Sequence, residues 1–411
     1  MKIVQINTVC GSGSVGRITV DLYRETEKAG DTPFIVYGRN PAPKGLNTYY
    51  MGSRMDFFHH VLVNFFQGKG GFASVGTTRR LIRWLETVQP DVIHLHNIHG
   101  FYLNVEILSK YLQKTGIPVV WTLHDCWPFT GHCAYFDHAG CEKWKEGCHD
   151  CDRHATAYPY ALFKDNSRAN YAAKKQAFTG WNLTIVTPSH WLAGLVKRSF
   201  LKDYPVAVIP NGIDLEQFHP GKENLRKPIE NKSNKPMILG VANRWEERKG
   251  LDVFLELAEK QGDRYQICLV GVDDRLVRKL SRRFPTDVLL PIGRTGSVEE
   301  LADIYRSADV FVNPTLEDNF PTTNLEALAC GTPVVTYNTG GSPESLTPSC
   351  GVVVDRNNRE LLYRGIAEVV EKVRTNTGFT PEECRKRAME FGREERFAEY
   401  ISLYHKMTAG E

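Results

Sequence analysis

The chain is 411 residues long, enough for two domains of about 100–200 residues each. Hydrophobic residues make up 42% and charged residues 24%, a composition typical of globular proteins. The net charge of +3 is small for this length and argues against a dedicated nucleic-acid binder. No apolar run approaches the roughly 18 residues that span a bilayer, and the segment MKIVQINTVCGSG predicts a first strand instead of a signal peptide, so we expect a cytoplasmic protein.

Short apolar, β-rich segments alternate with helical patterns along the whole chain. This alternation predicts an α/β architecture built on parallel sheets. In the first half, strands are expected at residues 2–8, 33–38, 91–95, 117–123, 183–187 and 206–209. In the second half, they are expected at residues 236–242, 265–271, 287–292, 309–313, 332–336 and 351–354.

A polar segment rich in Lys, Asn, Gly and Pro, residues 218–236, separates the halves and predicts a linker. We therefore expect two Rossmann-like, doubly wound domains that face an interdomain cleft, with ligands bound beyond the carboxyl ends of the strands. The first domain is expected to span residues 1–210, with a Cys-rich insertion at 126–154, and the second residues 211–385. Residues 386–411 are expected to form a helix that packs back on the first domain.

The first expected strand leads into a glycine-rich loop. Gly11, Ser12, Gly13 and Gly16 fit the pattern G-x-G-x-x-G, which lets a backbone approach a phosphate at a helix N-terminus. The same glycines could instead serve only a tight strand-to-helix turn. Arg39 follows the second expected strand and could bind a 2′-phosphate, which keeps an NADP-dependent oxidoreductase open as an alternative function.

Two cations follow the first expected strand of the second half. Arg244 and Lys249 lie in the segment ANRWEERKG, at the carboxyl end of that strand. A guanidinium group binds phosphate oxygens bidentately and an ammonium group acts as a mobile point charge, so the pair suits a diphosphate. Because Glu246 and Glu247 lie beside them, an ordinary solvated surface is the alternative.

Two carboxylates eight positions apart occur in the stretch NPTLEDNFPTTNLEALACGTPVV. Asp318 falls in a loop and Glu326 in the helix that follows, where they could hold two separate hydroxyl groups of one ligand. The first turn of that helix has N–H groups without partners in the helix and predicts an anion site, at Thr322, Thr323 and Asn324. The alternative is that the carboxylates only mark the entry to the helix.

The order Arg-x4-Lys, carboxylate-x7-Glu and A-C-G-T-P-V-V resembles the donor domain of the family 4 retaining glycosyltransferases, which have the GT-B fold. The stretches TPSHWLAGLV, VIPNGIDLEQFHP and SADVFVNP match as well, so the resemblance covers nearly the whole chain. NTVCGSGSVGRI and HLHNIHGFYLN resemble the subgroup that builds bacterial exopolysaccharide, colanic-acid and capsule chains. Asp318 departs from the family pattern, which usually has glutamate there.

The resemblance implies transfer of a hexosyl group, with retention, from a UDP- or GDP-linked sugar to a glycan or lipid-linked saccharide. It implies that Arg244 and Lys249 stabilise the departing diphosphate, that Asp318 contacts the donor sugar and that Glu326 contacts the ribose. The same donor-binding loop contains Asn319 and Phe320. No catalytic metal is expected, because the cations take its place. A non-catalytic protein that binds sugar nucleotides is a further alternative.

Histidines follow two strands of the first domain. His124, in WTLHDCW, matches the family's acceptor-domain histidine beside the reacting sugar, and the resemblance implies a catalytic role for it. His96 and His99 follow an earlier strand in the same way. We expect them to line the acceptor site together with the glycine loop, unless they are core histidines.

Five of the ten cysteines lie between residues 126 and 151. Four of them have the spacing C-x7-C-x6-C-x2-C and could supply thiolates to a tetrahedral structural zinc, namely Cys133, Cys141, Cys148 and Cys151. The spacing differs from that of familiar zinc ribbons, so free thiols and disulfides are alternatives.

Residues 54–83 combine several phenylalanines with four arginines. Such a composition is typical of a patch that touches anionic lipid at the inner membrane, as a lipid-linked acceptor would require. Ordinary core packing with solvated arginines is the alternative.

Overall fold

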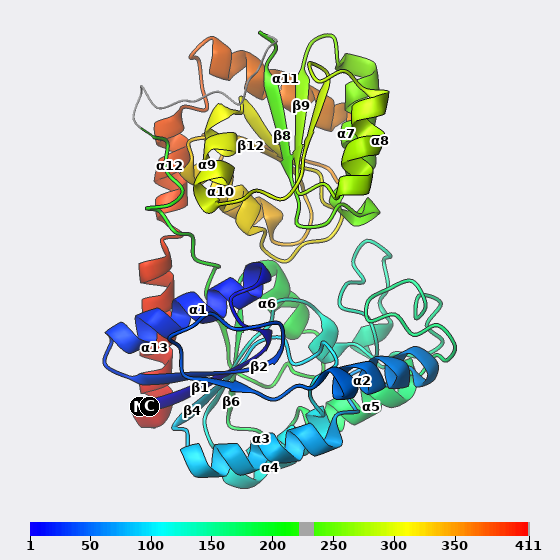
Figure 1. Cartoon of the computed structure of the whole chain (residues 1–411), viewed down its shortest axis with the longest axis vertical. Coiled ribbons are helices and arrows are strands. Elements are labelled where there is room, and N and C mark those ends of the chain that lie inside the picture. Colours follow the sequence, from blue (N-terminus) through cyan, green and yellow to red (C-terminus); the bar gives the residue numbers. More distant parts are fainter. Residues whose placement is uncertain (222–233, 410–411) are drawn as a thin grey trace. The chain divides into compact units, whose positions relative to one another are not determined.

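The computed structural model describes residues 1–221 and 234–409 (Figure 1). The expected linker at 218–236 therefore lies largely outside the described residues. The chain divides into two compact units, Met1–Pro210 with Arg396–Glu411 and Asn211–Glu395. The division after Pro210 falls at the expected position. None of the helices within the described ranges is both long enough and apolar enough to cross a bilayer.

The C-terminal segment joins the first unit later than expected. Helix α12 (Pro381–Met389) packs against α10 (Thr322–Ala329) and buries Cys384 and Ala388 in the second unit. The prediction that residues 386–411 all pack on the first domain is therefore wrong for residues 386–395. Helix α13 (Arg393–Ala409) contributes buried aromatic side chains to the core of the first unit, namely Phe397, Tyr400 and Tyr404.

The first unit contains a seven-stranded parallel sheet with the order β3-β2-β1-β4-β5-β6-β7. Its strands are β1 (Lys2–Val9), β2 (Thr32–Arg39), β3 (Thr48–Tyr50), β4 (Val92–Leu95), β5 (Val119–Thr122), β6 (Leu183–Thr187) and β7 (Val206–Val208). Edge strand β3 was not predicted, because its three residues are at least partly exposed and form no apolar run. The helices are α1 (Gly13–Lys28), α2 (Arg54–Gln67), α3 (Val75–Val88), α4 (Val105–Thr115), α5 (Ser167–Ala177) and α6 (His190–Val196).

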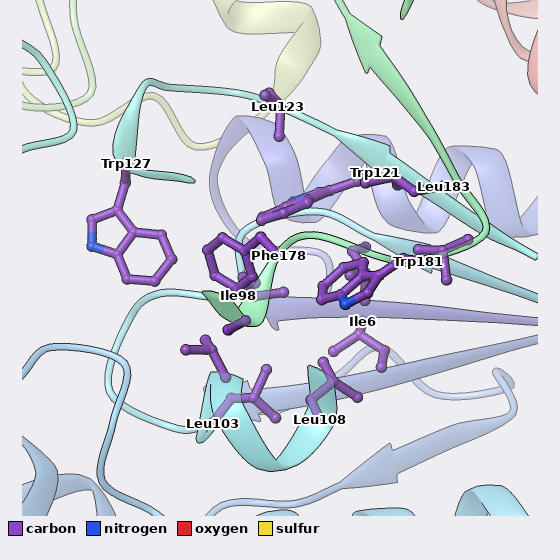
Figure 2. Close-up of a cluster of buried hydrophobic side chains, with 14 of the residues drawn as sticks. Ile6, Ile98, Leu103, Leu108, Trp121, Leu123, Trp127, Phe178, Trp181 and Leu183 are labelled. Atoms are coloured by element: carbon purple, nitrogen blue, oxygen red, sulfur yellow. The ribbon is translucent and has the colours of Figure 1, made fainter. Parts of the chain in front are cut away.

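Helices cover both faces of this sheet (Figure 1). On one face, α1 and α13 pack on Ile3, Val92 and Val120. On the other, α3 and α4 belong to a larger cluster that contains three aromatic residues in mutual ring contact, Trp121, Phe178 and Trp181 (Figure 2).

Strand alternation decides which side chains meet α1 and α13. Because successive residues of a strand point to opposite faces, Ile93 and Leu95 face the α3–α4 cluster, and His94 lies on the other face with Val92. The registers pair Gln5 with His94 and His94 with Val120. The polar residues Gln5 and His94 of two adjacent strands thus share the face that α1 and α13 cover, beside the apolar Val120.

The second unit contains a six-stranded parallel sheet with the order β10-β9-β8-β11-β12-β13. Its strands are β8 (Met237–Val241), β9 (Gln266–Val270), β10 (Leu289–Ile292), β11 (Val310–Asn313), β12 (Val334–Tyr337) and β13 (Gly351–Val354). Residues of α9 (Val298–Ser307), α10 and α12 enter one core, and residues of α7 (Leu251–Gln261), α8 (Asp274–Arg283) and α11 (Arg359–Arg374) enter another. All twelve expected strands are present, which confirms the predicted α/β class.

Candidate functional site

The loops that follow β8 and β11 meet in the second unit, because these strands are neighbours in the sheet. Lys249 ends the short helix η3 (Glu247–Lys249) after β8, and Asp318 lies in the loop after β11. Lys249 Nζ donates to Asp318 Oδ2 at 2.5 Å, and the two side chains are 23% and 16% exposed. Two residues predicted to bind one donor molecule are thus in direct contact.

A third loop supports this pair from the end of β12. Gly340 has a φ of +57°, and a Cβ atom there would lie 1.8 Å from the Asp318 carbonyl oxygen. Any larger residue would clash with the loop that carries Asp318. On the other side, the Leu316 N–H donates to the Arg248 carbonyl at 2.8 Å and the Arg248 guanidinium donates to the Glu317 carbonyl at 2.7 Å. The position of Asp318 is therefore fixed mainly by backbone contacts.

Arg244 is placed differently from Lys249. Its side chain is 81% exposed, and its Nε lies 3.2 Å from Glu246 Oε1. This geometry fits the alternative interpretation, in which Arg244 belongs to an ordinary solvated surface. The structure does not bring Arg244 into the Lys249–Asp318 pair.

Helix α10 begins beside Asp318, after Pro321. The N–H of Asn324, predicted to lack a partner, donates to the Pro321 carbonyl at 3.2 Å. Its buried side chain accepts from Asn313 Nδ2 at 2.8 Å and donates to Ser345 Oγ at 2.9 Å. Asn324 therefore anchors the helix, and the first-turn donors of the predicted anion site reduce to Thr322 and Thr323.

Three other predicted donor residues are buried, among them Asn319. Glu326 is 5% exposed and accepts from the Tyr305 hydroxyl at 2.8 Å. Phe320 packs against Phe391, with ring centroids 5.6 Å apart. The Phe320 side chain thus holds the loop to the core, and a contact of this residue with a donor stays a prediction.

The glycine loop of the first unit is a closed turn. The Gly11 N–H donates to the Gly16 carbonyl at 2.8 Å, and α1 begins at Gly13. Asn40 Nδ2 donates to Ser12 Oγ at 3.2 Å. The tight-turn alternative accounts for these contacts, since the Gly11 N–H already has a partner.

The predicted histidines of the first unit form a buried network with residues that the sequence analysis did not single out. His124 follows β5 and is partly exposed, and its Nε2 lies 3.2 Å from His96 Nδ1. His96 Nε2 in turn lies 3.1 Å from Gln5 Oε1. His96 is only 2% exposed, so it supports His124 from within the protein and does not line an open site as predicted.

His99 is also buried, and its Nε2 lies 2.8 Å from Asp125 Oδ2. Burial alone would raise the pKa of Asp125, yet His99 and the Trp127 N–H, which donates at 2.9 Å, lower this pKa below its ordinary value. Asp125 therefore stays ionised and fixes the chain directly after His124. Its position next to His124 in WTLHDCW was a signal that the sequence analysis could have used.

The four clustered cysteines are free thiols, and all four are partly buried. Burial, and then the three other thiols of the cluster, raise the pKa of Cys133 to about 12. Cys133, Cys141 and Cys151 line a pocket of about 250 Å³. Across residues 1–221 and 234–409, no group of three or more His, Cys, Asp or Glu side chains is arranged to hold a metal ion. Zinc at this cluster stays a prediction.

Helix α2 exposes an apolar stripe. Met55, Phe58, Leu62 and Phe66 are between 52% and 84% exposed and recur at helical spacing. Phe66 stacks on Phe163, which is 66% exposed, with ring centroids 5.0 Å apart. These four side chains are therefore not packed in a core, and their contact with a membrane stays a prediction.

Comparison with known proteins agrees with this architecture. A family model described as Glycosyltransferase Family 4 matches residues 15–217, and one described as Glycosyl transferases group 1 matches residues 221–390. The Escherichia coli (strain K12) protein named as a colanic acid biosynthesis glycosyl transferase, WcaC, is 24% identical over 99% of this chain and 100% of its own length.

Solved structures share the fold. Sucrose-phosphate synthase from Thermosynechococcus elongatus is 18% identical with a TM-score of 0.70, covering 100% of both chains. Anabaena Alr3699/HepE in complex with UDP is 14% identical with a TM-score of 0.67, covering 98% of each chain. With two family models in tandem and two Rossmann-like units that correspond to them, the chain belongs to the family 4 glycosyltransferases of the GT-B fold.

Proposed function

We propose that the protein transfers a hexosyl group from a nucleotide sugar to a saccharide acceptor, with retention, in bacterial surface polysaccharide biosynthesis. The observation that carries the proposal is the Lys249–Asp318 pair at the ends of β8 and β11, beside the start of α10. Membership of the glycosyltransferase family disfavours the NADP-dependent oxidoreductase. The relative from Escherichia coli, named for colanic acid biosynthesis, supports the polysaccharide assignment.

In the proposed reaction, the bond from the sugar C1 to the diphosphate oxygen breaks and a bond from C1 to the acceptor oxygen forms on the same face. The acceptor proton passes to the departing phosphate, so no protein base is required. Negative charge grows on the diphosphate as it leaves. Lys249 and the Thr322 and Thr323 N–H groups would stabilise this charge, and their cationic and dipolar character would replace a metal.

The ion pair also suggests how a donor would be received. Without ligand, Lys249 and Asp318 satisfy each other's charge. A diphosphate would attract the ammonium group, because charge-assisted contacts to phosphate are strong. Asp318 would then be available to accept hydrogen bonds from hydroxyl groups of the donor sugar.

Thermal unfolding against UDP, GDP, ADP, NADP and NAD in one buffer tests the donor class. A ligand at 100 times its Kd adds about 2.7 kcal/mol to the stability. We expect UDP or GDP to stabilise the protein, and the Anabaena structure in complex with UDP supports this choice. Stabilisation by NADP alone would overturn the proposal. Donor binding without nucleotide release in the presence of saccharide acceptors would instead support a non-catalytic protein.

We further propose that the α2 stripe touches the inner face of the cytoplasmic membrane. Met55, Phe58, Leu62 and Phe66 would enter the interface, and the exposed basic residues at either end of the helix, Arg54 and Lys69, would meet anionic lipid. Flotation with vesicles that contain anionic phospholipid should recover the wild type but not a Phe58→Ser, Leu62→Ser double variant. Equal flotation of both proteins would contradict the proposal. Met389→Ser, at an exposed residue of the second unit, is the control.

We also propose a structural zinc at Cys133, Cys141, Cys148 and Cys151, on the basis of their spacing in the sequence. A zinc held by four thiolates would pin the insertion. Elemental analysis of the purified protein should find about one zinc per chain. Cys148→Ser should lower that content, and Cys268→Ser, at a buried thiol of the second unit, should not. A metal-free wild type would end the zinc proposal.

A further inference from the structure

A chain of hydrogen bonds links α1 to the end of β5 through two neighbouring strands. Gln5 Nε2 donates to the Thr19 carbonyl at 3.1 Å, and Gln5 Oε1 faces His96 Nε2. His96 Nδ1 faces His124 Nε2. Gln5 and His96 are 0% and 2% exposed, so water does not compete for these contacts. This series of hydrogen bonds ends at His124, which is partly exposed.

The Thr19 carbonyl determines which atom donates and which accepts in each of these hydrogen bonds. A carbonyl can only accept, so it must face the amide nitrogen of Gln5, and Oε1 is left to face His96. An oxygen at that position requires a proton on His96 Nε2. In a neutral imidazole the second nitrogen is then an acceptor. His96 Nδ1 therefore accepts, and the proton of that contact belongs to His124 Nε2.

We infer that Gln5 and His96 are positioning residues that hold His124 in the Nε2–H tautomer, so that its Nδ1 presents a lone pair to a substrate hydroxyl. The role of the lone pair rests on the proposed function. Within the described residues, no hydrogen bond is made to His124 Nδ1. His94 provides the contrast, because Tyr404 and Thr122 occupy both of its nitrogens, at 2.6 and 2.8 Å.

The electrostatic surroundings agree with neutral rings. Burial lowers the pKa of His96 well below its usual value, and the neighbouring His94 and His124 lower it further. Withdrawal from water lowers the pKa of His124 to about 4, even though Asp125 raises it. Both imidazoles therefore have one donor and one acceptor nitrogen near pH 7, as the order of donors and acceptors in these hydrogen bonds requires.

Two substitutions of His96 separate this role from simple packing. In His96→Asn, the amide oxygen takes the place of Nδ1 and can still accept from His124 Nε2. In His96→Leu, no acceptor remains. Imidazole nitrogen–proton correlation spectra of 15N-labelled full-length protein report the His124 tautomer directly. A His124→Asn variant assigns the signal, and circular dichroism confirms that each variant is folded.

We expect the Nε2–H form of His124 in the wild type and in His96→Asn, and a mixture of tautomers in His96→Leu. An Nδ1–H form in the wild type, or an unchanged tautomer in His96→Leu, would overturn the inference. These spectra need no substrate, so they stand even where the proposed transferase activity fails. With a donor and acceptor that support turnover, kcat should fall about tenfold in His96→Leu and recover in His96→Asn. A changed tautomer with unchanged kcat would overturn the role of the lone pair.

Discussion

The two units place polar groups in contrasting ways. Of the 13 histidines, His219 alone falls in the second unit and the other 12 fall in the first. The first unit buries uncharged groups that hydrogen-bond to each other, such as Gln5 and His96. The second unit instead places a charged pair, Lys249 and Asp318, in the loops at the ends of its strands.

Because of this difference, we expect the first unit to respond to acid and the second to respond to a charged ligand. Acid lowers the stability of a fold that buries a neutral histidine, because the protonated ring is poorly solvated there. An ion pair in a loop is insensitive to mild acid, but it is ready to exchange its partner for a charged ligand. The first unit is therefore suited to orient a neutral hydroxyl, and the second to hold an anionic leaving group.

Lys249→Ala tests the charged side of the comparison and should have the largest effect. Loss of one preorganised group that stabilises a leaving group costs about 2.7–4 kcal/mol, so kcat should fall by about 10²–10³. Nucleotide release measures the effect. Lys235→Ala removes a lysine paired with Asp287 at 2.9 Å elsewhere in the same unit and serves as the control. Unchanged kcat in a folded Lys249→Ala protein would remove Lys249 from the site.

Acid should unfold the first unit before the second, and His60 offers the clearest case. Burial first, and then His59, lower the pKa of His60 to about 3. The Gly71 N–H donates to His60 Nε2 at 3.0 Å, so protonation breaks a hydrogen bond. Because the unfolded chain binds the proton near pH 6.5, stability falls as pH drops from about 6.5 toward 3. At pH 4.5 the expected loss is about 2–3 kcal/mol.

Hydrogen exchange at pH 7 and pH 4.5 resolves the two units and measures this loss. The carboxylates that pair in the second unit keep their charge over most of this range, since ordinary Asp and Glu pKa values lie near 4. His60→Gln retains an acceptor for the Gly71 N–H and removes the titrating ring. If the variant loses as much stability at pH 4.5 as the wild type does, His60 is not the source of the acid sensitivity.

Arg244→Ala should have the smallest effect of the three. Its guanidinium is 81% exposed, so a donor phosphate would gain only a screened contact. We expect KM for the donor to rise about tenfold or less, with kcat nearly unchanged and the difference reduced by added salt. Arg278→Ala, at an exposed arginine of α8, is the matched control. A kcat loss as large as that of Lys249→Ala would show that Arg244 moves into the site.

The candidate site was predictable where its residues follow strands in neighbouring loops. Lys249 and Asp318 were found this way, because the loops beyond adjacent parallel strands meet. Gln5 was missed, since a single polar residue in an apolar strand carries no spacing signal. Phe320 and Asn324 were assigned to the ligand, yet Phe320 packs on Phe391 and Asn324 bonds to Asn313. A motif names the residues of a loop without showing which of them face inward.

The sequence by itself determined the α/β class, the twelve strands that it predicted and the division after Pro210. Hydrophobic runs bounded by turn residues specify these features locally. Only the tertiary structure decided that residues 386–395 belong to the second unit and that His96 lies behind His124. Those outcomes depend on contacts between segments far apart in the chain, such as Gln5 with His96 and α12 with α10. No local pattern encodes such contacts, because each partner's burial depends on the other.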